Sequence, residues 1–149
     1  KINHQLLMDY VFKGGTLVAQ YNTLSELPDE LGPYSLRISR DRVTEEDSRV
    51  KILNNDHKLL NYPNKISEED FNGWIQERGL YFPGDCAPEY ESLLEMKDKN
   101  SEPLQGSLLH CKYGKGDFIY TSLAFFRQLP AGITGAYNLF INLISAGTN

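Results

Sequence analysis

The C-terminal third of the chain, residues 104–149, most constrains the fold. It holds three basic residues and one acid, so charge is scarce and burial is expected. Residues 107–112 predict a strand, and Gly114 and Gly116 predict a tight turn because glycine tolerates the positive φ values of hairpin loops. Residues 117–122 predict the returning strand, since β-branched and aromatic side chains favour strands. This segment indicates a scaffold around which the rest of the chain packs.

A helix is predicted after this hairpin, near the C-terminus. Apolar side chains recur there at helical spacing and form one broad stripe, which we expect to be buried. The stripe consists of Ile133, Ala136, Tyr137, Phe140, Leu143 and Ile144.

The N-terminal residues predict a second helix, which ends at Gly14 and Gly15, because glycine is common just past the end of a helix. Residues 16–22 follow as a strand whose apolar start is typical of a strand covered on both faces. This order is half of a βαβ unit, so we expect its first strand upstream of Lys1 in a larger protein. The expected inward stripe of the helix is Ile2, Leu6, Leu7, Tyr10 and Val11.

The middle of the chain predicts short strands and one helix. We expect strands at 34–38, 49–53 and 80–82, and expect residues 90–96 to pair with the strand at 107–112. The predicted helix begins at Ser67, which can cap free amide groups and is followed by three acids that complement the helix dipole. Its expected inward side chains are Phe71, Trp74 and Ile75, and its end is at Glu77, Arg78 and Gly79.

The totals fit one domain, residues 1–149, with 40% hydrophobic and 23% charged residues. The net charge of −5 argues against nucleic acid or an anionic membrane as a partner, because both reward clustered Lys and Arg. No apolar run approaches the roughly 20 residues that cross a bilayer. The polar stretch 24–47 is a long excursion that we interpret as a surface insertion.

Catalytic and metal-binding patterns are scarce. His4, His57 and His110 are isolated in the sequence, so we expect no metal or other cofactor in this chain. Cys86 and Cys111 form no Cys-x-x-Cys motif, and we expect free thiols, although the sequence leaves a bridge between them open.

Two further patterns could carry hydrolytic chemistry. Residues 84–88 resemble a nucleophile elbow around Cys86, but Pro88 replaces the second glycine and removes a backbone donor. Glu89, Glu91 and Glu95 could supply acid and base groups, although nothing in their spacing distinguishes them from an acidic surface.

Residues 74–82 allow two interpretations. Trp74, Glu77, Arg78 and Tyr81 could form a surface that contacts a sugar or a partner, with a ring for stacking and charged groups for hydroxyls. Alternatively, Trp74 packs in the core and the two charged residues close a helix end.

Several segments resemble a known family. Residues 10–23 resemble the helix, Gly-Gly, strand portion of class I glutamine-amidotransferase-like domains. Residues 64–66, 70–71 and 74–82, the hairpin at 114–120 and the helix at 138–143 are similar to the version appended to LmbE-like (PIG-L type) deacetylases of Bacteroidetes-like bacteria. This resemblance implies a flavodoxin-like α/β fold in three layers, lacking its N-terminal strands here.

The resemblance also implies a function. LmbE-like catalytic domains remove acetyl groups from N-acetylglucosamine-type sugars with zinc held by a His-Pro-Asp-Asp motif, which this chain lacks. We therefore expect a non-catalytic accessory domain, with zinc confined to the parent's catalytic domain. Its partners would be that upstream domain, a carbohydrate or a second copy.

Two alternatives stay open: a degenerate hydrolase that uses Cys86, and a pure association domain like the related domain in some β-galactosidases. The resemblance to bacterial proteins leaves a cytoplasmic and an exported location equally open.

Overall fold

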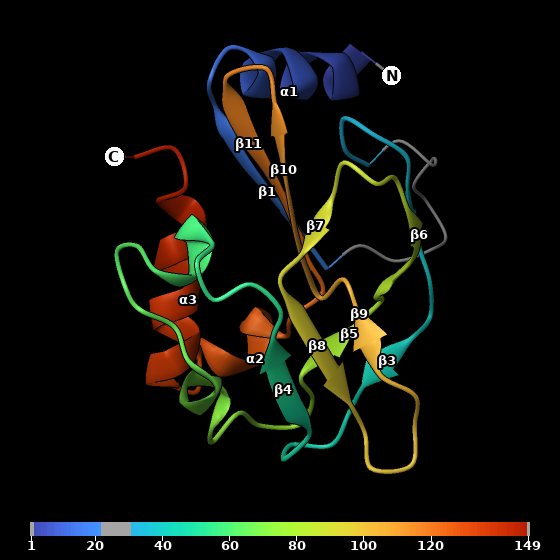
Figure 1. Ribbon diagram of the computed structural model, residues 1–149, viewed down its shortest axis with the longest axis vertical. Coiled ribbons are helices and arrows are strands. Elements are labelled where there is room, and N and C mark those ends of the chain that lie inside the picture. The colour runs from blue at the N-terminus through green and yellow to red at the C-terminus, as the bar shows by residue number, and fades with distance from the viewer. Residues whose placement is uncertain (1, 22–30, 149) are drawn as a thin grey trace.

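The computed structural model describes residues 2–21 and 31–148 and has a mixed α/β architecture with several sheets and few helices (Figure 1). Its largest sheet has the order β1 (Thr16–Gln20), β11 (Gly116–Thr121), β10 (Leu108–Tyr113) and β7 (Glu91–Ser92). β1 runs parallel to β11, whereas β10 runs antiparallel to both of its neighbours. The predicted α/β class is therefore confirmed.

The hairpin predicted from the C-terminal third is confirmed as β10 and β11. Tyr113 pairs with Gly116, so the loop is two residues long, and Gly114 has a φ of 58°. Gly116 lies against the end of helix α1 (Ile2–Phe12), where an added Cβ would stand 2.0 Å from the carbonyl oxygen of Val11. The N-terminal helix and the C-terminal hairpin are thus in direct contact.

Helices α1 and α3 (Thr134–Ile144) contact opposite faces of this sheet. Val11 of α1 packs in a cluster with Phe118 and Tyr120 of β11, whereas Leu139 of α3 packs in a second cluster with Ile119. Alternate side chains of a strand point to opposite faces, so β11 separates the two apolar clusters. All six residues of β11 are buried.

The helices exist as predicted, but both predicted inward stripes are wrong in part. In α1, Val11 is buried, whereas Leu6, Leu7 and Tyr10 are 62%, 46% and 55% exposed. The side chain of Ile2 lies outside the described residues. The sheet reaches only the narrow side of α1 that carries Met8 and Val11, so the broader apolar face points outward.

Helix α3 is rotated relative to the predicted stripe. Its buried residues are Ala136, Leu139, Asn142 and Leu143. Tyr137 and Ile144 are 43% and 57% exposed, although the stripe placed both inside. Asn142 lies on the buried face because its side-chain amide donates to two backbone carbonyl oxygens. A search for apolar periodicity cannot predict the burial of such a polar residue.

The helix predicted from Ser67 is only a 3₁₀ turn, η2 (Glu68–Phe71). Ser67 caps it as expected, and Asp70 completes a capping box. Gly73 then adopts a φ of 74°, and the indole Nε1 of Trp74 donates to the carbonyl oxygen of Asp70 at 2.9 Å. The capping residues therefore start a helical turn, but the backbone leaves the helical conformation after Phe71.

The remaining strands form three small sheets beside the main one (Figure 1). They are β2 (Leu36–Ile38) with β6 (Pro83–Cys86), β3 (Arg42–Val43) with β5 (Gly79–Leu80), and β4 (Arg49–Ile52) with β8 (Leu94–Lys97) and β9 (Leu104–Gln105). The segment 90–96 was predicted to pair wholly with β10; its first part does so as β7, but its second part is β8 and pairs with β4 and β9.

β1 is an edge strand, with β11 as its one strand partner among residues 2–21 and 31–148. Its residues are half-buried, so the expectation of a strand covered on both faces is met only in part. Position 22 of that predicted strand, like 24–30 of the predicted excursion, lies outside the described residues. No helix within the described ranges is long and apolar enough to span a membrane.

Candidate functional site

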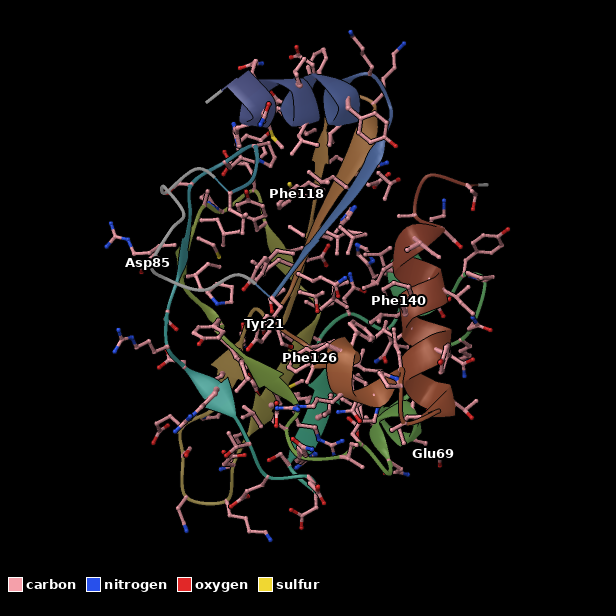
Figure 2. All side chains as sticks on the ribbon, turned by 180° about the vertical axis from the view of Figure 1, so that it is seen from behind. Tyr21, Glu69, Asp85, Phe118, Phe126 and Phe140 are labelled. Carbon is pink, nitrogen blue, oxygen red and sulfur yellow. The ribbon has the colours of Figure 1, made fainter. Side chains whose placement is uncertain are left out.

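Three aromatic rings meet on the surface at the carboxyl ends of β1 and β11, and we call Tyr21, Tyr81 and Phe126 the aromatic surface. The ring centroids of Tyr21 and Phe126 are 4.6 Å apart, and those of Tyr21 and Tyr81 are 5.7 Å apart. Figure 2 shows Tyr21 beside Phe126. Tyr21 and Phe126 are each 41% exposed, which leaves part of both rings open to solvent.

Two of these residues have unusual backbone conformations. Tyr21 has a φ of 49° and Tyr81 a φ of 60°, in the left-handed region that bulky side chains rarely adopt. Each such residue costs on the order of 1–3 kcal/mol, and such residues concentrate at functional sites. The buried hydroxyl of Tyr120 donates to the carbonyl oxygen of Tyr81 at 2.7 Å, which holds that conformation in place.

A charged pair adjoins the aromatic surface. The Nε of Arg127 lies 3.1 Å from an Oε of Glu77, and the Arg127 guanidinium lies 5.1 Å from the ring centroid of Phe126. The Arg127 side chain is 42% exposed and that of Glu77 is 11% exposed. The ring of Phe126 and the guanidinium of Arg127 are thus exposed together, and the largely buried carboxylate of Glu77 is bonded to the guanidinium.

The chemistry open to this arrangement is noncovalent contact through a ring and a charged pair. Exposed aromatic rings can pack on the apolar C–H face of a pyranose, and charged groups beside them can bond to its hydroxyl groups. A nucleophile requires an adjacent base, and none of the hydrogen bonds among these described side chains pairs a nucleophile with a base.

The four residues predicted to form a contact surface are divided between the surface and the core. Tyr81 belongs to the aromatic surface, whereas Glu77 is itself buried and reaches that surface only through its ion pair with Arg127. Trp74 is 2% exposed and stacks near Phe71 and Phe125, with centroids 5.1 and 5.9 Å away.

Arg78 is also buried and holds backbone segments together. Its guanidinium donates to the carbonyl oxygen of Ser48 at 3.0 and 3.2 Å and to that of Phe71. Burial lowers the pKa of Arg78 below its ordinary value. Neither Trp74 nor Arg78 has an open face in this structure.

Sequence reasoning missed Tyr21, Phe126 and Arg127. A signal that could have found Phe126 is its neighbour Phe125, a few residues after β11, since a helix as short as α2 (Phe125–Gln128) can bury only one of the two rings. Phe125 is indeed 1% exposed and Phe126 is 41% exposed. Nothing in the sequence near Tyr21 indicates that it meets a ring about a hundred positions away.

A second polar cluster lies between β10, β11 and the loop around the short helix η1 (Lys58–Leu60). His57 Nε2 lies 3.2 Å from His110 Nδ1, and His110 Nε2 lies 2.7 Å from an oxygen of Asp117. Lys112 Nζ lies 2.9 Å from the other oxygen of Asp117. We call His57, His110 and Asp117 the histidine chain; their side chains are 11%, 12% and 7% exposed.

The histidine chain does not have the arrangement of a metal site. The backbone N–H of Leu59 donates to His57 Nδ1 at 3.1 Å, so the neutral ring carries its proton on Nε2, which leaves Nε2 no lone pair for a metal. Within the described part of the chain, no group of three or more His, Cys, Asp or Glu is placed to hold a metal ion.

The two cysteines are free thiols, as expected. Cys86 is exposed and Cys111 is buried. Burial, and to a smaller extent Asp85, raises the pKa of Cys86, while burial raises the pKa of Cys111 to about 12. Both shifts disfavour the thiolate that nucleophilic attack requires.

Two of the three candidate glutamates are engaged by amide side chains. Asn54 Nδ2 donates to Glu91 at 2.6 Å, and Gln105 Nε2 donates to Glu95 at 2.8 Å.

Comparison with known proteins gives similarity at the level of the fold. No family description and no curated protein sequence matches the chain. The cytoplasmic protein STM3548 of Salmonella typhimurium superposes with a TM-score of 0.57 and 13% identity, over 96% of this chain and 59% of that one. A β-galactosidase from Rahnella sp. R3 superposes with a TM-score of 0.52 and 18% identity, over 94% of this chain and 21% of the enzyme. The chain is thus similar in fold to part of two longer proteins.

Proposed function

We propose that this chain is a flavodoxin-like, non-catalytic accessory domain of an LmbE-like N-acetylglucosaminyl deacetylase, and that it contacts carbohydrate through the aromatic surface. The observation that carries the proposal is the exposed ring pair of Tyr21 and Phe126 beside the Arg127–Glu77 ion pair. In α/β folds, ligands bind beyond the carboxyl ends of parallel strands, which is where these residues lie.

The strained backbone of Tyr21 and Tyr81 supports the same proposal. Residues held in a strained backbone conformation cluster at binding and active sites, and Tyr21 and Tyr81 are two such residues in contact. The fold similarity to a 21% portion of a β-galactosidase adds a precedent for this fold inside a larger protein named for action on a sugar.

The test is binding of N-acetylglucosamine oligomers and their partly deacetylated forms to the 149-residue chain, measured by isothermal titration calorimetry. Tyr21→Ala and Phe126→Ala should each weaken binding by about tenfold or more, because stacking on a ring contributes about 1–3 kcal/mol. Both are surface changes and should leave the melting temperature within a few degrees of the parent.

A matched control is Tyr62→Ala, an aromatic residue that is 42% exposed and takes no part in the ring contacts of this surface. It should bind as the parent chain does. Equal loss in the control, or no binding of either sugar by the parent, would refute the carbohydrate proposal.

A second candidate function is self-association, favoured by a face without charge. Residues 128–149 contain no Asp, Glu, Lys or Arg, and neither does β1. Tyr137, Ile141 and Ile144 of α3 are exposed there. A groove of about 420 Å³ continues this face between the end of α1 and α3, with Val18 and Ile144 in its lining.

The occupant that this face suits is a second copy of the chain. Two copies, each with a net charge of −5, repel one another least where charge is absent, and an exposed apolar face promotes pairing. Both functions can coexist, because the aromatic surface and this face involve different residues.

Sedimentation velocity between about 5 and 500 μM tests the second candidate. The parent chain should form a reversible dimer, which Ile144→Glu should dissociate by placing a charge in the contact. Phe126→Glu, on the aromatic surface and outside this face, is the control and should not change the dimer. A parent chain that stays monomeric at the highest concentration would exclude self-association.

A further inference from the structure

The histidine chain accounts for every ring nitrogen of His57 and His110. Leu59 N–H donates to His57 Nδ1, so His57 carries its proton on Nε2 and donates to His110 Nδ1. His110 then carries its proton on Nε2 and donates to Asp117. The bonds therefore all run in one direction, from the backbone of the loop to a carboxylate of β11.

We propose that His57 and His110 form a proton-sensitive latch, which holds the 54–61 loop on β10 at neutral pH and releases it when either ring takes up a second proton. The inference is independent of the carbohydrate and association proposals, because it uses none of their residues.

The physical reason is that every ring nitrogen of His57 and His110 already takes part in a hydrogen bond. An additional proton on either ring must therefore break one of these bonds. A proton on His57 Nδ1 would face the Leu59 N–H, which already points at that atom. A proton on His110 Nδ1 would bring two N–H groups together across 3.2 Å. Either event replaces a hydrogen bond with a repulsive contact between two donors.

The charged groups around the rings set how readily protonation occurs. Burial and the neighbouring His110 lower the pKa of His57, while Glu91 of β7, at 3.6 Å, and Asp117 of β11 oppose this. Burial would raise the pKa of Asp117, but the hydrogen bonds from His110 and Lys112 outweigh it and hold that pKa below its usual value. Asp117 thus stays ionised and fixes the orientation of His110 throughout the range in which His57 titrates.

Other contacts keep the loop attached to α3 when the latch opens. Asn142 Nδ2 donates to the carbonyl oxygen of Leu59 at 2.9 Å, and Lys58 Nζ donates to the carbonyl oxygen of Ala146 at 3.1 Å. Neither contact involves a histidine. The release is therefore confined to the side of the loop that faces β10.

Two-dimensional NMR of the 149-residue chain between pH 8 and 5 tests the latch. The exchange rate of the Leu59 amide, divided by its intrinsic rate at each pH, should rise at least tenfold as the His57 ring titrates. The amide of Asn64 serves as the internal reference, since it donates to Asn142 at 2.9 Å and involves no histidine, and its protection should not change.

A variant pair makes the result specific. His57→Gln removes the titrating ring, so the pH dependence of Leu59 exchange should disappear, whereas His4→Gln should keep it. Unchanged protection of Leu59 while His57 titrates would overturn the latch, as would a His57 ring that stays neutral down to pH 5. The titration of the parent chain decides the question even when His57→Gln does not fold.

Discussion

Single buried polar side chains hold the loops of this protein to its helices. Asn142 is fully buried and bonds to Leu59 and Asn64, while Gln128 is fully buried and bonds to Ile75 and Glu77. Each amide satisfies backbone groups that would otherwise be buried without a partner, which costs about 1–3 kcal/mol per group. Polar side chains of this kind explain how long irregular segments can pack so closely.

Trp74 is the residue whose removal should cost most stability in this region. Trp74→Ala removes a ring that is 2% exposed and leaves a cavity, so we expect a loss of about 3–5 kcal/mol in the free energy of unfolding. Urea denaturation at pH 7.5 measures it. Trp74→Phe should lose much less, and an unchanged midpoint for Trp74→Ala together with lost sugar binding would assign Trp74 to a ligand surface instead.

The candidate site was only half predictable at this scale. Glu77 and Tyr81 follow one another closely in the sequence, so their mixture of ring and charge was visible there. Tyr21 and Phe126 meet only because β1 lies beside β11, and no local pattern encodes that contact. The same holds for His57 and His110, which look isolated in the sequence and are hydrogen-bonded in space.

At the scale of elements, α1 and the β10–β11 hairpin are in close backbone contact. The Lys115 N–H donates to the carbonyl oxygen of Phe12 at 3.0 Å. Gly116 has no room for a side chain, because an added Cβ would lie 2.0 and 2.3 Å from the carbonyl oxygens of Val11 and Gly15. Both neighbours are backbone atoms that cannot rotate away.

Gly116→Ala should therefore separate the helix from the hairpin and lower the free energy of unfolding by at least about 3 kcal/mol, at the upper end of the cost of overpacking. Differential scanning calorimetry would report it as a lower melting temperature. Gly84→Ala is the control: its nearest neighbour would be the Cβ of Ser39 at 3.3 Å, and we expect a change of less than about 1 kcal/mol. Equal melting temperatures of Gly116→Ala and Gly84→Ala would contradict the prediction that Gly116 has no room for a side chain.

Elements specified by local signals were predicted correctly, and those that depend on neighbours were not. The hairpin needs only its two glycines and alternating strands, so β10 and β11 were found. The Ser67 cap is equally local and present, yet Gly73 and the Trp74 indole end the helix after one turn. The buried sides of α1 and α3 depend on which part of the sheet each helix meets.

At the scale of the whole molecule, stability should fall as the pH falls. The pKa of His57 is lowered in the folded state, chiefly by burial, so the unfolded chain binds more protons below its ordinary value of 6.5. Folding stability is then complete above about pH 6.5 and declines below it as the folded pKa is approached. Asp98 and Asp117, whose pKa values are also lowered, should add a second decline below about pH 4.

Urea denaturation at intervals from pH 8 to 3 measures this profile. His57→Gln should flatten the first decline and leave the second in place. A profile that is level between pH 7 and 5 in the parent chain would contradict the sign derived for His57.

The parallel pairing of β1 with β11 has a consequence for biosynthesis. Thr16 and Asp117 are partners about a hundred positions apart, so β1 leaves the ribosome long before the strand that completes it. At a translation rate of roughly 5–20 residues per second, β1 remains unpaired for several seconds before β11 is synthesised. During translation the nascent chain would therefore depend on chaperones most acutely before the final hairpin emerges.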